Sequence, residues 1–357
     1  LVGTQTSANV KYYAEIVKEK SVLRSLIKLN EETANACYLE NEPLDELLER
    51  TEKRVFELAE NGNSQEYVPI KQVVLNALDV IEKASKTKGN VTGIPTGFID
   101  LDYKLSGLQR SDLVLIAARP SMGKTAFVLN IAQHVAFRQN LAVAIFSLEM
   151  SKEQLVNRLF SLESHVDAQV LRNGNLTDTD WEKLIEGAGT IGSSRMIIDD
   201  TSGISISEMR SKCRKYKLEQ GLDLIIIDYL QLMSGSGGRK NESRQQEISD
   251  ISRSLKSLAR ELQVPVLALS QLSRAVEQRP DHRPMLSDLR ESGALEQDAD
   301  IVMFLYRDEY YQREKSEEGT EKTEINIAKH RNGPTRQIEL AFERNINAFY
   351  NYENQNG

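Results

Sequence analysis

A short run of small and charged residues, directly after an apolar segment, constrains this chain more than any other feature. Residues 116–125 read Ile-Ala-Ala-Arg-Pro-Ser-Met-Gly-Lys-Thr. In a phosphate-binding loop, successive backbone N–H groups point at phosphate oxygens, while a lysine and a hydroxyl reach the terminal phosphates and a magnesium ion. The run therefore predicts a nucleoside triphosphate site, whose binding residues are Arg119, Pro120, Ser121, Met122, Gly123, Lys124 and Thr125.

The loop departs from the usual pattern G-x-x-x-x-G-K-[ST] at one position. Ala118 stands where the first glycine belongs, and Gly123 keeps the second. The flanking residues supply the required context, because 113–117 is typical of a buried strand and 126–137 is typical of a helix. This order of strand, loop and helix favours a nucleotide site over a chance Gly-Lys-Thr in a turn.

The composition is that of a globular chain. With 357 residues, 40% hydrophobic and 27% charged, the chain is long enough for one large domain and a smaller one. Cys37 and Cys213 are far apart and lack C-x-x-C spacing, which argues against a disulfide framework or a zinc site and suits a reducing compartment. No apolar run reaches the roughly 18 residues that span a bilayer. We therefore expect a cytoplasmic protein with no membrane partner.

The net charge of −8 limits how a nucleic acid could bind. An acidic chain repels a polyanion overall, so any nucleic-acid surface must be local, such as the lining of a channel. The chain begins with Leu1 rather than methionine, so we expect it to be part of a longer natural protein.

Helical periodicity dominates the first part of the chain. Residues 10–60 predict a hairpin of two amphipathic helices, the second of which begins after Pro43. A third helix follows, with apolar side chains at helical spacing from Ile70 to Ile81, and residues 83–90 predict an exposed connector. A lone helix has no core of its own, so it packs either on its own domain or on a neighbouring subunit.

From Gly93 onward, strands and helices alternate, which predicts a largely parallel sheet. The apolar, β-rich runs are 113–118, 142–147, 195–198, 224–227, 264–269 and 301–305. The runs 324–328, 337–342 and 348–350 lack intervening helices, so we expect them to pair antiparallel at one edge.

Two carboxylates follow predicted strands. Asp228 closes the run 224–227, as expected for the acid that holds magnesium beside a phosphate loop. Glu149 follows the run 142–147 at the carboxyl edge, where ligands bind in open sheets, and is our candidate to orient the water that attacks the γ-phosphate. The alternatives are an aspartate that caps a turn and an acidic N-cap for the stretch after Ser151.

Other polar residues lie where strands end. Gln271 follows the run 264–269, where its amide could bind a γ-phosphate or simply be solvated. Lys329 and Arg331 point to the same side of an alternating strand, which ends in the turn Asn332-Gly333-Pro334. Such a pair is commonly solvated, yet an arginine finger inserted into a neighbouring site requires the same arrangement.

Together with the run 287–300, these segments resemble the bacterial replicative DNA helicases, the DnaB-type ring helicases. The most specific matches are 118–125 (Ala-Arg-Pro-Ser-Met-Gly-Lys-Thr), 147–150 (Ser-Leu-Glu-Met) and 329–334 (Lys-His-Arg-Asn-Gly-Pro). The family's phosphate loop has the form seen here, so Ala118 is no defect. The resemblance implies an α/β fold, with a RecA-like P-loop ATPase domain on a mostly parallel central sheet, preceded by a helical hairpin and a linker helix.

The resemblance also implies a division of the chain and a set of partners. Residues 1–64 would be the remnant of a helical N-terminal domain, residues 65–92 a linker with an amphipathic helix, and residues 93–357 the ATPase and helicase motor. The linker helix would pack on the next subunit of a homohexamer. The implied cofactors are ATP and Mg²⁺, and the implied partners are single-stranded DNA, primase and a helicase loader.

The family's site roles apply to matching residues of this chain. Lys124 and Thr125 would bind ATP, with Thr125 and Asp228 holding Mg²⁺, and Glu149 would activate water. Gln271 would couple the phosphate to the DNA loops.

Further roles of the family concern neighbouring subunits and DNA. Lys329 and Arg331 would act in trans on the adjacent subunit's nucleotide. The segment with Arg290, Glu291 and Gly293 would line the central channel and hold the phosphates of single-stranded DNA, although an arginine beside a glutamate is commonly a solvated pair. Independently of the resemblance, the glycine-rich loop with Arg239, Lys240 and Arg244 is a second candidate for phosphate contact, because flexible basic loops favour electrostatic binding that does not depend on sequence. Neither segment offers aromatic side chains for base stacking, so we expect phosphate contacts rather than base readout.

Two rival functions remain open from the sequence. A RecA-like strand-exchange or repair ATPase would share the sheet, Glu149 and Asp228, but would form an open filament on DNA. A ring-forming ATPase that acts on proteins suits the net charge of −8, although not the run 290–293.

Overall fold

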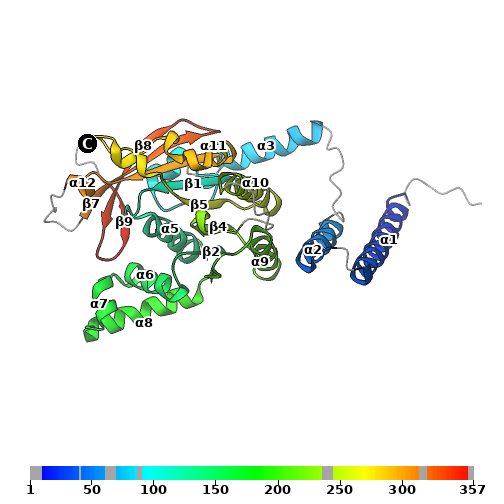
Figure 1. Ribbon diagram of the computed structural model, residues 1–357, viewed down its shortest axis with the longest axis horizontal. Helices are drawn as coiled ribbons and strands as arrows, with labels where there is room; N and C mark the ends of the chain where they lie inside the picture. Colours follow the sequence, from blue (N-terminus) through cyan, green and yellow to red (C-terminus); the bar gives the residue numbers. More distant parts are fainter. Residues whose placement is uncertain are drawn as a thin grey trace, which may run out of the picture. The chain divides into compact units, whose positions relative to one another are not determined.

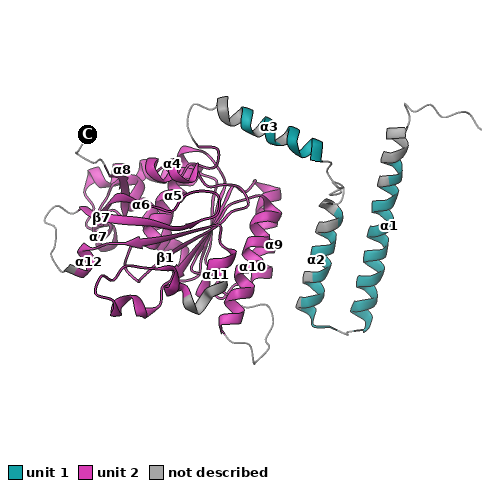
Figure 2. Ribbon diagram, turned by 90° about the horizontal axis from the view of Figure 1, so that it is seen from above, with its two compact units in different colours: residues 1–85 teal, residues 86–357 magenta. Residues whose placement is uncertain are grey.

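The computed structural model describes residues 10–39, 42–60, 70–86, 91–234, 244–312 and 320–352. The chain forms two compact units, residues 1–85 and residues 86–357, which Figure 2 colours separately. Among the described residues, no helix is long and apolar enough to cross a membrane. The boundary between the units falls near the end of the third helix, and the predicted division at residues 64 and 92 stays a prediction.

The first unit is helical. α1 (Val10–Leu39) and α2 (Leu44–Glu60) form the predicted hairpin, with Leu29 and Leu47 buried and with Arg54 paired to Glu32. α2 begins directly after Pro43, as the sequence predicts. α3 (Ile70–Lys86) extends four residues into the predicted connector, of which 87–90 lie outside the described residues.

The apolar stripe of α3 is exposed. Its side chains have between 46% and 76% of their surface accessible, and they are Ile70, Val73, Val74, Leu75, Leu78 and Ile81. Burying such a stripe is the main source of stability for a helix of this kind, so α3 carries a surface that another element must cover.

Within the described residues, the larger unit is built on a nine-stranded sheet of order β3-β2-β4-β5-β1-β6-β7-β8-β9 (Figure 1). The parallel strands are β1 (Leu113–Ala118), β2 (Val143–Ser147), β3 (Met196–Asp199), β4 (Leu224–Asp228), β5 (Val266–Gln271) and β6 (Ile301–Tyr306). Antiparallel strands continue the sheet beyond β6, and they are β7 (Thr320–His330), β8 (Arg336–Glu343) and β9 (Ala348–Asn351). The predicted sheet with its antiparallel edge is confirmed.

Helices connect the strands and cover the sheet (Figure 1). They are α4 (Ile99–Leu105), α5 (Lys124–Gln133), α6 (Lys152–Ser164), α7 (Ala168–Asn173), α8 (Asp178–Ser193), α9 (Ile206–Glu219), α10 (Arg244–Leu262), α11 (Gly293–Asp298) and α12 (Glu309–Gln312). α5 continues into the π-helical turn η3 (His134–Arg138), and short 3-10 segments are η4 (Leu230–Leu232), η5 (Arg274–Gln278) and η6 (Leu286–Ser292).

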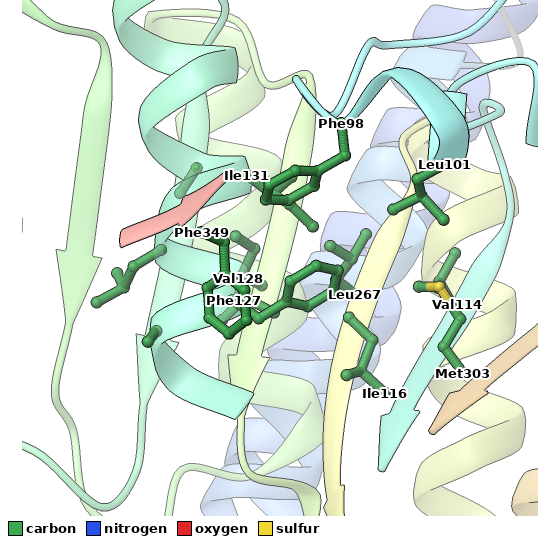
Figure 3. Close-up of a cluster of buried hydrophobic side chains, with 14 of the residues drawn as sticks. Phe98, Leu101, Val114, Ile116, Phe127, Val128, Ile131, Leu267, Met303 and Phe349 are labelled. Atoms are coloured by element: carbon green, nitrogen blue, oxygen red, sulfur yellow. The ribbon is translucent and has the colours of Figure 1, made fainter. Parts of the chain in front are cut away.

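Both faces of β1, β2, β4 and β6 are buried, which explains why these strands are continuous apolar runs, whereas β7 and β8 alternate between buried and more exposed residues. On β1, Val114 and Ile116 belong to one buried cluster, together with Phe127 of α5 (Figure 3). Leu115 belongs to the cluster on the opposite face, together with Leu255 of α10. On the parallel strands, polar groups are thereby restricted to the strand ends.

Asn130 fastens α5 to the antiparallel edge. Its amide nitrogen donates to the carbonyls of Ala126 and Asn347, at 2.8 and 2.9 Å. Its amide oxygen accepts the backbone N–H of Phe349 at 2.9 Å. The β8–β9 hairpin is therefore held against the helix that follows the phosphate loop.

A buried group of charges lies at the amino end of the parallel strands. The carboxylate of Asp300 accepts the N–H of Leu113 at 2.8 Å and pairs with Lys256. Burial and the negative charge of Asp300 raise the pKa of Asp112 from 3.8 to about 6, while Lys256 and Arg331 oppose this shift. Asp112 is therefore less stable as an anion in the folded chain than in the unfolded one.

The hydrogen bonds of Asn130 predict a destabilised variant. Asn130→Ala leaves the carbonyl of Asn347 and the N–H of Phe349 without this partner, so the free energy of unfolding is expected to fall by about 2 kcal/mol. Urea denaturation of the full chain measures the change. Asn173→Ala, at an exposed position on α7, is the control, and an equal effect of the two substitutions would contradict the assigned role of Asn130.

The raised pKa of Asp112 predicts a pH-dependent gain in stability. Ionisation of Asp112 lowers the free energy of unfolding. This effect is absent below the pKa of the unfolded state, near 4, and is fully present above the pKa of the folded state, about 6. Asp112→Asn is expected to raise the free energy of unfolding by about 1–3 kcal/mol at pH 7.5, and by less at pH 4. Urea midpoints at both pH values measure it, with the exposed Asp250→Asn as control. A gain that is equal at the two pH values would show that ionisation is not its cause.

Candidate active site

A cavity of about 810 Å³ lies where the parallel strands end. Its lining residues come from the predicted phosphate loop, from the ends of β2, β4 and β5, from α6 and from the antiparallel edge. They are Arg119, Pro120, Ser121, Gly123, Lys124, Thr125, Ala126, Glu149, Met150, Gln154, Arg158, Asp228, Tyr229, Gln271, Arg307, Tyr310, Phe342, Arg344 and Asn347. Of the predicted loop residues, Met122 is buried instead of lining the cavity.

The loop between β1 and α5 has the backbone that phosphate binding requires. Gly123, with φ +93°, precedes the first residue of α5, so the free N–H groups of that helix face the cavity. A Cβ at Gly123 would also lie 3.4 Å from the ring of Phe349. The Lys124 ammonium donates to the carbonyl of Ala118 across the loop, at 2.8 Å. Its burial lowers its pKa to about 8, and the nearby Asp228 and Glu149 oppose that shift.

Thr125 and Asp228 meet across the cavity. The threonine hydroxyl donates to Oδ2 of Asp228 at 2.7 Å, and the carboxylate is buried at the end of β4. Burial raises the pKa of Asp228, while Thr125 and Lys124 hold it down. Because the carboxylate binds a distant side chain, the alternative of a local turn cap is not supported. A hydroxyl and a carboxylate are oxygen ligands suited to Mg²⁺, which commonly takes few protein ligands and completes its shell with phosphate and water.

Glu149 lies beside Asp228. Ser147 pairs with Asp228 across β2 and β4, and the N–H of Leu148 donates to the Asp228 carbonyl at 2.7 Å. The next residue, Glu149, is exposed and lines the cavity. Its alternative role as a helix cap is not needed, because Ser151 caps α6 through a reciprocal pair of hydrogen bonds with Gln154.

Gln271 lies at the end of β5 and also lines the cavity. Its backbone N–H donates to the side-chain oxygen of Gln231 at 3.4 Å, and its carbonyl accepts from the same side chain at 3.3 Å. Arg244 in turn donates to the carbonyls of Gln231 and Met233. A chain of hydrogen bonds therefore runs from the cavity to the start of α10.

Arg119 does more than line the cavity. Its guanidinium is buried and donates to the carbonyl of Leu272 at 2.8 Å and to Glu277 at 2.7 and 2.9 Å. The phosphate loop is thereby tied to η5, a segment far from it in the sequence.

Several cavity residues were not predicted from the sequence. Arg158 extends from α6, and its pKa is lowered by burial and held up by Asp228 and Glu149. The sequence contains a signal for Arg158, because this cation lies three residues after Leu155, on the helix face that carries the buried apolar side chains. Arg307, Tyr310, Arg344 and Asn347 come from the antiparallel edge and its connections, where no motif marks them.

Lys329 and Arg331 lie at the opposite end of the strands. Lys329 pairs with Val302 near the start of β6, and its ammonium donates to carbonyls at the end of α11, including Ala299 at 2.8 Å. Arg331 donates its N–H to the Asp300 carbonyl at 2.9 Å, and its side chain lies 3.6 Å from the Asp300 carboxylate. Neither residue lines the cavity of its own chain.

The predicted DNA-binding residues are described only in part. The backbone of Arg290 and Glu291 lies in η6, and Gly293 begins α11, but the side chains of Arg290 and Glu291 lie outside the described residues. Arg239 and Lys240 also lie outside the described residues. We expected Arg244 to belong to the glycine-rich loop, but it is the first residue of α10 and pairs with Glu247.

Comparisons with known proteins match the chain along nearly all of its length. A family model, the DnaB-like helicase C terminal domain, matches residues 93–351. The replicative DNA helicase DnaC of Bacillus subtilis (strain 168) is 55% identical over 98% of this chain and 76% of its own length. The replicative DNA helicase DnaB of Geobacillus stearothermophilus is 54% identical over the same shares.

Two solved structures agree with these relatives. One is an ATPase domain that is 45% identical, with a TM-score of 0.74, and the match covers 80% of this chain and 99% of that one. A DnaB-like replicative helicase, described with its interactions with primase, is 39% identical, with a TM-score of 0.77, over 98% of this chain and 81% of that one. The chain therefore belongs to the DnaB-like replicative DNA helicases, ATP-dependent enzymes with a RecA-like fold.

Proposed function

We propose that this chain hydrolyses ATP with Mg²⁺ at the subunit interfaces of a homohexameric ring, and so moves along single-stranded DNA and unwinds the duplex at the replication fork. The observation that carries the proposal is the separation of two half-sites. Lys124, Thr125, Asp228 and Glu149 lie at the carboxyl end of the parallel strands, whereas Arg331 lies at the amino end.

The distance between the half-sites argues against a cis role for the finger. Arg331 bonds Asp300, whose N–H bonds Leu113 at the start of β1, and the phosphate loop begins at the other end of that strand. The five residue steps from Leu113 to Ala118 correspond to roughly 16 Å. Arg331 and Lys329 would therefore act on the nucleotide of an adjacent subunit, as an arginine finger supplied in trans does.

In each subunit, the loop residues would bind and orient the nucleotide. Lys124 would exchange the Ala118 carbonyl for phosphate oxygens, joined by the N–H groups at the start of α5. Thr125 and Asp228 would hold Mg²⁺, which neutralises charge on the phosphates. Glu149, exposed to the cavity, would orient the attacking water and accept its proton. Gln271 would sense the γ-phosphate and pass its state to Gln231 and the loop before α10.

Ring assembly and DNA contact complete the proposal. The exposed stripe of α3 would pack on the next subunit, which satisfies its need for a cover. Arg290, Glu291 and Gly293, with Arg239, Lys240 and Arg244, would hold the phosphates of single-stranded DNA in the channel. Primase and a loader are the further partners that we propose, and the solved relative described with its primase interactions supports the first. The cytoplasm is the proposed location.

The main test measures ATP turnover by the purified chain with and without single-stranded DNA, together with its mass when nucleotide is bound. The expected result is DNA-stimulated turnover by a hexamer, with displacement of a strand from a forked duplex. Filaments without strand displacement would favour the strand-exchange ATPase. A ring whose turnover ignores DNA would favour the ATPase that acts on proteins.

The trans role of Arg331 predicts complementation between two inactive variants. Arg331→Ala is expected to reduce turnover at least 10³-fold while retaining nucleotide affinity, because it leaves the loop of its own subunit intact. Glu149→Ala is expected to be inactive for a different reason, loss of the oriented water. Mixed rings contain some interfaces with an intact Glu149 and an intact Arg331, so turnover should reappear on mixing. Mixtures that stay as inactive as either variant alone would sink the trans assignment.

A further inference from the structure

Ser121, in the middle of the phosphate loop, holds a backbone conformation that a serine rarely adopts. Its φ is +65°, in the left-handed region where glycine is favoured and other residues are strained. The residue is exposed between Pro120 and the buried Met122. Strain of this kind persists only where surrounding groups determine the conformation.

Arg307 forms a hydrogen bond with the backbone of this turn. It follows β6 directly, has 2% of its surface exposed, and donates from Nη1 to the carbonyl of Ser121 at 3.1 Å. Its Nη2 donates to Glu321 on β7, and its guanidinium lies 4.9 Å from the ring centre of Phe342 on β8. Three contacts on different elements therefore fix the orientation of one planar group.

The charge of Arg307 is retained although the group is buried. Burial and the nearby Arg344 lower its pKa to about 10, so it is protonated at neutral pH. An isolated buried cation is costly, and Glu321 compensates this one while also pairing with Arg344 at 2.7 Å. The carbonyl of Ser121 thus accepts a hydrogen bond from a charged group whose orientation is fixed by its other contacts.

We propose that Arg307 is a positioning residue for the phosphate loop, and that its bond to the Ser121 carbonyl holds the loop's N–H groups in the orientation that binds phosphate. The inference rests on the proposed binding of ATP in this cavity. The antiparallel edge of the sheet then has a part in nucleotide affinity, although the predicted phosphate ligands lie on the parallel part.

A double-mutant cycle tests this role. Arg307→Gln is expected to raise the dissociation constant for a fluorescent ATP analogue with Mg²⁺ about tenfold, equivalent to about 1.4 kcal/mol. Ser121→Gly alone should change it less than twofold. Because glycine adopts a positive φ without strain, the loss caused by Arg307→Gln should shrink below threefold in the Ser121→Gly background. KM for ATP should follow the same pattern, with kcat changing less.

Other roles for Arg307 give different results. A guanidinium that contacts the nucleotide directly, or that only supports the fold, predicts the same loss in both backgrounds, and that outcome overturns the inference. Arg344→Gln removes the other cation at Glu321 and is the matched control, so its effect should be equal in both backgrounds. If Arg307→Gln fails to fold, Arg307→Lys replaces it in the cycle. Lysine keeps the charge, but its single ammonium cannot bond Ser121 and Glu321 with the geometry of the planar guanidinium. Wild-type protein that does not bind the analogue would overturn the proposed function as well.

Discussion

Burial of both faces of the central sheet is the constraint on which the rest of the structure depends. Val114 and Leu115, adjacent on β1, are buried in clusters on opposite faces. On the parallel strands, polar chemistry is therefore found where the strands begin or end. The carboxyl ends collect the groups suited to phosphate and Mg²⁺, and the amino ends collect Asp112, Asp300 and Arg331. Under the proposed function, one subunit would thus carry two incomplete halves of a shared site, at opposite ends of its parallel strands.

The antiparallel strands give the phosphate loop a rigid support. The ring of Phe349 lies 3.4 Å from the position of a Cβ built at Gly123, and Asn130 fixes the β8–β9 hairpin to α5. Arg307 adds a charged hydrogen bond to Ser121 from the same region. A loop that keeps its shape before a ligand arrives loses less conformational entropy on binding, so this support would favour affinity for the proposed nucleotide.

Local patterns predicted much of this arrangement. The loop ending in Lys124 and the acid Asp228 each follow an apolar strand in the sequence, so spacing alone placed them at the same edge. The family resemblance carried the assignment of Arg331. Neither could reveal Arg307 or the inward-facing guanidinium of Arg119, because their partners Glu321 and Glu277 are brought near only by tertiary packing. Helix α10 likewise includes Arg244, which its neighbours in the sequence had marked as a loop residue.

The ion pair between Arg119 and Glu277 has a thermodynamic consequence. It joins the phosphate loop to η5, and the chain runs from η5 into η6, which contains Arg290. Free-energy coupling between two binding events is reciprocal, so under the proposed function nucleotide and DNA would change each other's affinity by the same factor. Under the proposed function, tension on η6 would therefore change how tightly the nucleotide is held in the cavity.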